Sequence, residues 1–139
     1  MRTVRDGSGR RLLLVKESAE SSLVRDPETG EERYVDAADL EPVDGASPLA
    51  TAARGLPDPS RRLVTAARDD RALGLLVELD ERGPLAVTEL LSAYDLCESD
   101  LHGLLAEFRA AGLVAETEVD GRRGYELTAE AGATLDALR

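Results

Sequence analysis

Residues 87–128 read VTELLSAYDLCESDLHGLLAEFRAAGLVAETEVDGRRGYELT, and this stretch decides the fold. Apolar residues recur twice at i, i+3, i+4 and i+7, the spacing that gathers them on one face of a helix. The two sets are Val87, Leu90, Leu91 and Tyr94, and Leu101, Leu104, Leu105 and Phe108. Only a short break at 95–97 separates them. The spacing therefore predicts two consecutive helices joined by a tight turn.

A β-hairpin is expected after the second of these helices. Gly112 ends that helix in the position where a left-handed residue is favoured. The β-rich runs LVAETEV (113–119) and YELT (125–128) flank the turn sequence DGRRG (120–124), whose glycines bound the turn. Thr128 then caps a last helix, which carries apolar residues as far as Leu138.

Two further helices are expected upstream. Leu73, Leu76 and Val77 follow a helical spacing that ends at Gly83-Pro84, and Asp69 or Asp70 caps this helix. Ser60 caps the helix before it, which runs through RRLVTAAR (61–68). The order of elements is therefore helix, helix, helix, helix, β-hairpin, helix.

This order resembles the winged helix-turn-helix transcriptional regulators of the MarR and ArsR type. Residues 76–132 carry the resemblance, with AAGLV (110–114) and YELTAEAG (125–132) as the most family-like parts. The resemblance covers about half of the chain and implies a fold, which does not by itself give a function. Composition and the N-terminal pattern also suggest an uncharacterised haloarchaeal family.

The N-terminal part is expected to be β-rich. The runs RLLLVK (11–16), SSLVR (21–25) and EERYV (31–35) are strand candidates, and Asp26-Pro27-Glu28-Thr29-Gly30 is a hairpin turn between the last two. Four of the six prolines fall within 36–60. We therefore expect an α+β protein with a small antiparallel β-meander module at 1–42, a Pro/Gly-rich linker at 43–60 that includes one short helix at 49–54, and the winged helix-turn-helix domain at 61–139.

Acidic residues outnumber basic ones by 28 to 17, which gives a net charge of −11. Lys16 is the only lysine beside sixteen arginines, and aromatic residues make up 3% of the chain. This composition resembles that of proteins from halophilic archaea that accumulate salt, because dense carboxylates keep a protein hydrated when salt screens charge repulsion. An acidic mesophilic protein from a GC-rich genome is the alternative.

The resemblance also implies where DNA would be contacted. In such regulators the third helix of the motif enters the major groove, and the wing reaches the backbone or the minor groove. In this chain the third helix of the motif is the one that carries Leu101 to Phe108, directly before the hairpin. The candidate contact residues on the helix are Ser99, His102 and Arg109. Arg122 and Arg123 are expected as paired cations at the wing tip. Three acidic residues share the helix surface, namely Glu98, Asp100 and Glu107, and residues 61–139 hold 9 basic against 16 acidic residues.

Other kinds of site have little support in the sequence. His102 is the only histidine and Cys97 the only cysteine, so we expect no metal site, no disulfide and no catalytic triad. Cys97 aligns with the start of the third helix and is interpreted as a buried turn residue. We expect no cofactor and no enzyme activity. No apolar run reaches the roughly 20 residues that span a bilayer, and no signal peptide is visible, so a cytoplasmic protein is expected.

The expected function is that of a transcriptional regulator that binds double-stranded DNA as a homodimer, because two half-sites supply enough contacts. The N-terminal meander or the helix at 60–68 would form the dimer contact. The alternative is a protein-interaction module that presents its acidic third helix to a partner protein. A sensor with a small molecule held between the two parts is the least supported reading.

Overall fold

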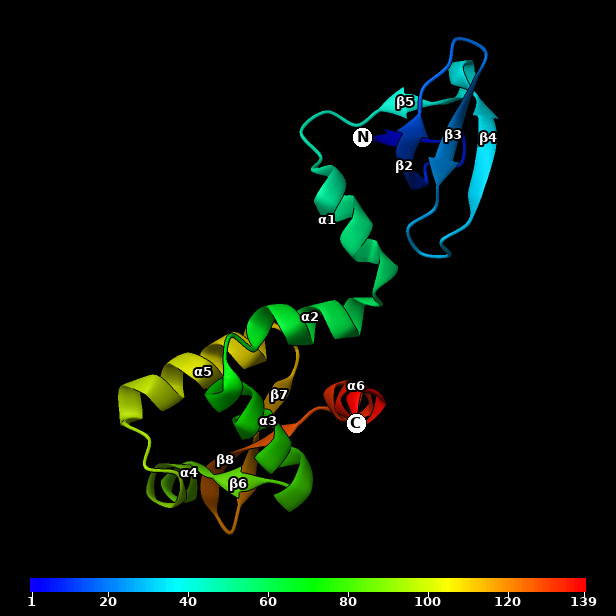
Figure 1. Cartoon of the computed structure of the whole chain (residues 1–139). Coiled ribbons are helices and arrows are strands. Elements are labelled where there is room, and N and C mark those ends of the chain that lie inside the picture. Colours follow the sequence, from blue (N-terminus) through cyan, green and yellow to red (C-terminus); the bar gives the residue numbers. More distant parts are fainter. The chain divides into compact units, whose positions relative to one another are not determined.

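The computed structural model describes all 139 residues, and the chain forms two compact units, Met1–Asp58 and Pro59–Arg139 (Figure 1). Each unit has an apolar core of its own. None of the helices is long and apolar enough to cross a membrane.

The first unit is built on a five-stranded antiparallel sheet. Its strands are β1 (Arg2–Arg5), β2 (Arg11–Lys16), β3 (Ser21–Arg25), β4 (Glu32–Asp36) and β5 (Glu41–Pro42), in the order β4-β3-β2-β1-β5. A short 3-10 helix, η1 (Ala37–Asp39), separates β4 from β5. The three predicted strands are present as β2, β3 and β4. The predicted meander was too small, because β1 and β5 extend the sheet; each is too short for an alternating pattern to reveal.

Both faces of β2 are covered. Leu12 and Leu14 lie on one face in a cluster with Val4 and Val24, whereas Leu13 points to the other face and is also fully buried. On that side the helix α1 (Pro48–Ala52) packs against β1 and β2, and a hydrogen bond of 2.6 Å joins the hydroxyls of Thr51 and Thr3. The second 3-10 helix, η2 (Ala53–Gly55), continues α1. The short helix expected at 49–54 is therefore present and belongs to the first unit.

The hairpin turn predicted at Asp26–Gly30 is confirmed. The backbone N–H of Gly30 donates to the carbonyl of Asp26 at 2.8 Å, and Gly30 adopts a φ of 75°. Strands β3 and β4 pair in register on either side of the turn.

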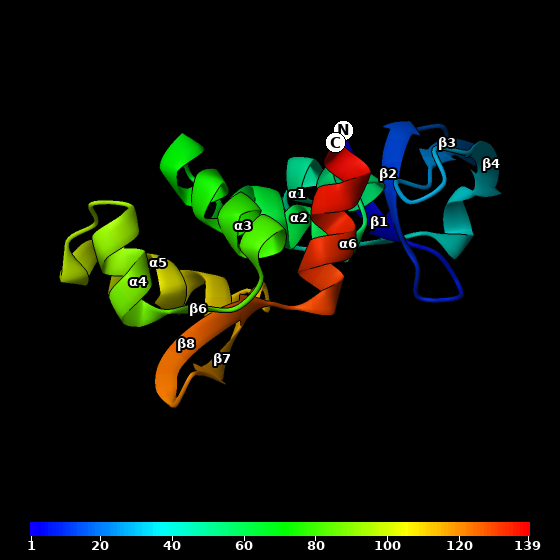
Figure 2. The same ribbon diagram turned by 90° about the horizontal axis from the view of Figure 1, so that it is seen from below.

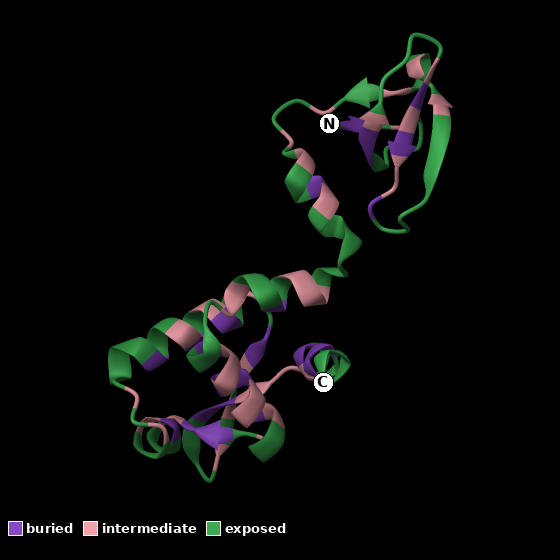
Figure 3. Ribbon diagram, in the orientation of Figure 1, coloured by how far each residue is buried: buried purple, intermediate pink, exposed green.

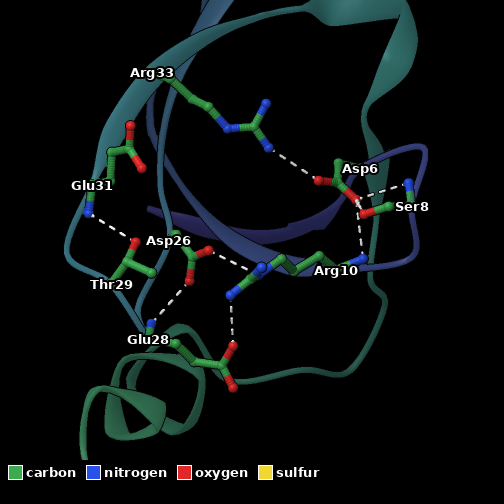
Figure 4. Close-up of polar contacts among 8 residues, drawn as sticks. All are labelled: Asp6, Ser8, Arg10, Asp26, Glu28, Thr29, Glu31 and Arg33. Carbon is green, nitrogen blue, oxygen red and sulfur yellow. Dashed lines mark hydrogen bonds and ion pairs between the residues drawn. The ribbon is translucent and has the colours of Figure 1, made fainter.

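A polar network joins this turn to the loop between β1 and β2 (Figure 4). Asp6 accepts hydrogen bonds from the hydroxyl of Ser8 at 2.6 Å, from the backbone N–H of Arg10 at 3.0 Å and from Arg33 on β4 at 3.0 Å. Arg10 in turn forms ion pairs with Asp26 at 2.8 Å and with Glu28 at 2.9 Å. The hydrogen bond from Ser8, helped by those from the backbone and Arg33, holds the pKa of Asp6 below its usual value.

Asp6→Asn is expected to lower the thermal stability of the first unit at neutral pH, because the charged acceptor of the network is lost. The folded-state pKa of Asp6 lies below the unfolded one, so the unfolded chain binds more protons in acid. The contribution of Asp6 is therefore present above about pH 4 and is lost as the pH falls through the lower folded pKa. Unfolding curves of the wild type and the variant should converge in acid. Asp44→Asn, at an exposed position outside the network, is the control. A stability gap that is constant with pH would contradict this role for Asp6.

The second unit consists of five helices and a small sheet. The helices are α2 (Asp58–Ala66), α3 (Asp70–Arg82), α4 (Val87–Ala93), α5 (Glu98–Ala110) and α6 (Ala129–Leu138). The predicted caps at Asp69 and Thr128 are confirmed, since each side chain accepts from the backbone N–H three residues later. The helix α2 begins at Asp58, two residues before the predicted cap at Ser60.

One apolar core joins these helices to the sheet. Its buried members come from α2 to α6 and from all three strands (Figure 3). They are Leu63, Ala72, Leu75, Leu76, Leu79, Leu85, Leu90, Leu101, Leu105, Phe108, Leu113, Val114, Tyr125, Ala131 and Leu135. Both apolar sets predicted at i, i+3, i+4 and i+7 pack into or against this core, so α4 and α5 are oriented by the residues that predicted them.

The sheet of the second unit contains the wing. It is formed by β6 (Leu85–Ala86), β7 (Val114–Val119) and β8 (Arg122–Leu127), in the order β6-β8-β7. Figure 2 shows the β7–β8 hairpin projecting from the helices of the unit, with β6 alongside β8. The strand β6 was not predicted, because two residues carry no periodic pattern.

The turn of the wing lies elsewhere than the sequence suggested. Asp120 and Gly121 form a two-residue turn with positive φ values of 51° and 76°, and Val119 pairs directly with Arg122. This is the turn type that an Asp-Gly pair favours in hairpins. Arg122 and Arg123 are therefore the first two residues of β8, and their side chains point to opposite faces of the hairpin. The expectation of paired guanidiniums at the tip was wrong.

Gly124 is required by the contact between β6 and β8. A Cβ atom at this position would lie 2.6 Å from the carbonyl oxygen of Leu85 and 2.8 Å from a methyl group of Val119. Both distances are shorter than real Cβ contacts allow, and the nearer neighbour is backbone that cannot rotate away. The small side chain lets the wing approach β6.

Gly124→Ala is therefore expected to destabilise the second unit by about 1–3 kcal/mol, the range for overpacking a closed site. Gly74→Ala is the matched control: Gly74 lies inside α3, and nothing stands within 4 Å of the added Cβ. Alanine there should stabilise by about 0.5–1 kcal/mol, because glycine costs that much inside a helix. Urea unfolding of both variants measures the difference. Equal effects of the two substitutions would show that the β6–β8 approach is not tight.

Candidate nucleic-acid interface

The helix α5 is held by one buried face. Leu101, Leu105 and Phe108 are fully or almost fully buried, whereas His102, Ala106 and Arg109 are exposed. The helix begins after Cys97, whose thiol makes no capping hydrogen bond to the backbone. Cys97 is itself exposed, so the expectation of a buried turn cysteine was wrong. The outward row of α5 is available to a partner along the whole helix.

Each acidic residue of α5 lies beside an arginine or histidine of the same chain. Glu107 forms an ion pair with Arg68, which lies between α2 and α3, and Asp100 lies 4.0 Å from Arg71 on α3. Glu98 lies 3.6 Å from His102, one helical turn along α5. Two of the carboxylates that make this helix acidic are therefore partly compensated by arginines from α3 and from the loop before it. All these pairs are exposed, so each contributes little to stability.

An open groove of ≈ 610 Å³ runs between α5 and the wing. It is lined on one side by His102 and Arg109 of α5, and on the other by Arg123 and Tyr125 of β8. Three of the five candidate residues, His102, Arg109 and Arg123, thus meet in one place although they come from two elements.

Glu116 of β7 connects the two arginines of this groove. Its Oε1 atom accepts a hydrogen bond from Arg109 at 3.0 Å, one from Arg123 at 2.6 Å and one from the hydroxyl of Tyr125 at 3.2 Å. Arg123 also donates to the hydroxyl of Tyr125 at 2.9 Å, and its guanidinium lies 5.7 Å from the centre of that ring. A single carboxylate oxygen therefore collects three donors from α5 and β8.

Charge shifts the pKa values of these groups in the directions that the contacts dictate. The hydrogen bond from Arg123, with the positive charge of Arg109 nearby, lowers the pKa of Glu116 below its usual value. The hydrogen bond to Glu116 raises the pKa of Arg123, and Tyr125 acts in the same direction. Glu116 is accordingly a carboxylate, and Arg123 a cation, over the whole physiological range.

The two remaining candidate residues lie outside this groove. Ser99 stands in the first turn of α5, with its hydroxyl 3.4 Å from the sulfur of Cys97, and lines a separate depression with Arg68 and Arg71. Arg122 points to the other face of β8, where its guanidinium donates to Thr88 of α4 at 3.4 Å. The five candidates therefore do not form one continuous site.

Sequence reasoning missed Glu116 and Tyr125. The signal that would have found them is the Asp-Gly pair at 120–121, because a two-residue turn there fixes the register of the hairpin. Counting outward from the turn places Glu116 opposite Tyr125 and Glu118 opposite Arg123, on one face. The turn was instead placed over DGRRG, between the glycines at 121 and 124, and the register was lost.

No group of three or more histidine, cysteine, aspartate or glutamate side chains is arranged to hold a metal ion.

A family described as being of unknown function, DUF7346, matches the chain over residues 1–139. The chain belongs to the DUF7346 family. Among solved structures, this DUF7346 member is similar to HlyU from Vibrio cholerae N16961, with 31% sequence identity and a TM-score of 0.50. That match covers 58% of this chain and 87% of HlyU. No match was found among curated proteins.

Two further structures are similar to the same DUF7346 member. One is a transcriptional regulator HlyU from Vibrio vulnificus CMCP6, with 30% identity, a TM-score of 0.49, and coverage of 57% of this chain and 82% of that one. The other is an ArsR family transcriptional regulator, with 19% identity, a TM-score of 0.46, and coverage of 60% and 84%. The predicted resemblance to winged helix-turn-helix regulators of the ArsR type is confirmed by the HlyU match and the order of elements.

Proposed function

We propose that this DUF7346 member is a transcriptional regulator that binds double-stranded DNA through α5 and the wing. The observation that carries the proposal is the groove in which Arg109 of α5 and Arg123 of β8 face each other. Guanidinium groups suit phosphate, because their planar donors match its oxygens. The likeness to HlyU supports the same function, since one HlyU is described as a transcriptional regulator.

The contacts divide into two kinds. Arg109 and Arg123 are proposed to bind backbone phosphates, which position a protein on DNA without reading its sequence. His102 and Ser99, on the outward row of α5, are the side chains proposed to reach base edges in the major groove. Arg122 is proposed as a flanking contact, because its side chain points away from Arg123.

A double variant tests the phosphate contacts. Arg109→Ala/Arg123→Ala should weaken binding to a fluorescent duplex of about 30 base pairs by roughly tenfold or more at about 0.1 M potassium chloride. The slope of log affinity against log salt should fall by about two, because two phosphate contacts are lost. Fluorescence anisotropy titrations at several salt concentrations measure both quantities.

Arg139→Ala is the control for this titration. Arg139 pairs with Asp80 and Glu81 of α3 and lies outside the groove, so its removal lowers the net charge by one, half the change in the double variant, without touching the site. Arg122→Ala is expected to give a smaller loss than the double variant. Equal binding by the double variant and the control would refute the groove as the DNA contact. Absence of binding by every protein would refute DNA binding and would favour the alternative, a protein partner for the exposed acidic first turn of α5.

We also propose a homodimer formed through α2, the predicted helix at 60–68, together with α6. An ion pair between Arg62 and Glu130 joins these two helices. Val64 on α2 is 50% exposed and Leu138 on α6 is 60% exposed, and both are large apolar side chains. A dimer would remove them from water and would present two wings to two half-sites.

Val64→Asp is expected to raise the dimer dissociation constant roughly tenfold or more, because a carboxylate would be buried without a partner. Light scattering after gel filtration should give twice the 14.9 kDa of the chain for the wild type and a smaller mass for the variant at the same concentration. Thr65→Asp adds the same charge at the next, exposed position and serves as the control. A monomeric wild type at high micromolar concentration would rule the dimer out.

A further inference from the structure

Glu116 differs from the other acidic residues that form ion pairs with arginines in the second unit. Most of these carboxylates pair with one cation, whereas Glu116 accepts from two arginines and a tyrosine through the same oxygen. The two arginines belong to α5 and β8, the two elements proposed to contact DNA. The side chain of Glu116 is 38% exposed, so its carboxylate is in contact with solvent.

The donors that hold Glu116 are the donors that a phosphate would need. A carboxylate and a phosphate both accept charge-assisted hydrogen bonds from guanidinium groups, in the same geometry and at similar distances. Both hydrogen bonds of Arg123 come from its Nη2 nitrogen, one to Glu116 and one to Tyr125, so the two N–H groups of that nitrogen are occupied. A phosphate oxygen can bind Nη2 of Arg123 only if one of these bonds is exchanged.

The local charge leads to the same conclusion. With His102 counted as neutral, two arginines and one carboxylate leave a single net positive charge in the groove. A backbone phosphate is therefore attracted by half of the charge that the two guanidiniums carry. Neighbouring Glu118 lies directly opposite Arg123 in the hairpin register but forms no ion pair with it. The compensation is thus specific to Glu116.

We propose that Glu116 is a built-in competitor for DNA phosphate: its carboxylate binds Nη1 of Arg109 and Nη2 of Arg123 together, and a phosphate must displace it to bind those two nitrogens. This inference rests on the proposed function and concerns the regulation of the same site. The affinity for DNA is therefore lower than two free arginines would give. When the carboxylate is displaced, one arginine on α5 and one on the wing become free to bind phosphate at the same time.

A positioning role for Glu116 predicts the opposite change in DNA affinity. If Glu116 served to hold the two guanidiniums in the orientation that DNA requires, its removal would weaken binding. Glu116→Gln separates the two roles, because the amide keeps the size of the side chain and its Oε1 acceptor while removing the charge. The sign of the change in affinity decides between them.

The test compares wild type, Glu116→Gln and Glu118→Gln in anisotropy titrations with a random-sequence duplex of about 30 base pairs. Glu118→Gln removes one negative charge from the same strand and the same face, two residues away, and so reports the general effect of charge. Glu116→Gln is expected to bind roughly three- to tenfold more tightly than Glu118→Gln at about 0.1 M salt, the range for losing two competing surface ion pairs. Its salt slope should steepen by about one.

The same substitutions in a chain that lacks both arginines test whether Glu116 acts through Arg109 and Arg123. In a chain that also carries Arg109→Ala and Arg123→Ala, Glu116→Gln should bind no better than Glu118→Gln, because no cation is left to release. Melting temperatures of all variants confirm that each is folded.

The outcomes are distinct. Tighter binding by Glu116→Gln, lost in the arginine-free background, supports the competitor. Binding by Glu116→Gln that equals Glu118→Gln or falls below wild type, while wild type binds the duplex, overturns the competitor and leaves the proposed function standing. Failure of every protein to bind the duplex, Glu116→Gln included, overturns the proposed function and the competitor with it.

Discussion

The two-residue turn at Asp120–Gly121 sets the position of every charged group on the wing. Both residues adopt positive φ, and this fixes Val119 opposite Arg122 and every pair beyond it. Side chains alternate along a strand, so a shift of one residue would exchange the two faces. Arg122 would then face α5, and Glu116 would leave the groove. The site between α5 and the wing is in this sense a consequence of one turn.

The orientation of the wing depends on a second constraint, the close approach of β8 to β6. Gly124 permits it, because any side chain at that position would strike the carbonyl of Leu85. Phe108 and Leu105 of α5 are buried in the same core as Tyr125 of β8. Helix and wing are therefore packed on one apolar base, and the polar contact through Glu116 joins them above it.

The sequence predicted those elements whose formation depends on residues close together in the chain. The helices α3, α4 and α5 bury one face each, so their apolar spacing predicts them, and the caps at Asp69 and Thr128 act within three residues. The strands β1, β5 and β6 were missed because each is too short to show a pattern, and β5 and β6 also pair with strands far along the chain. The wing was predicted, but its turn was extended over 120–124, whereas only Asp120 and Gly121 form it. Gly124 was interpreted as a turn glycine, whereas its role is steric.

The candidate site was predictable only in part for a related reason. His102, Arg109 and Arg123 were named correctly as neighbours of a common surface, since helix periodicity and a hairpin suffice for that. The separation of Arg122 from Arg123 and the bridging role of Glu116 both follow from register, which the misplaced turn concealed. The depression that holds Ser99 beside Arg68 and Arg71 depends on how α2 and α3 pack against α5, which no local pattern shows.

Net charge is a poor guide to what this domain can bind, because the relevant quantity is the charge left uncompensated at each place. Residues 61–139 are acidic overall, yet Glu107 and Asp100 on α5 pair with arginines of α3 and of the loop before it. The groove, in contrast, is lined by two arginines and no acidic residue, and Glu116 compensates one of their two charges, so the groove is locally positive within an acidic unit. Because that carboxylate bridges α5 and β8, its release would free one cation on each element together. The helix and the wing would then be linked in their contact with an anion, and the link lies in a pair of exposed ion pairs that salt weakens. The affinity of such a surface for an anion depends on whether the arginines bind carboxylates of their own chain or oxygens of the anion. The net charge of the whole domain does not enter that competition directly.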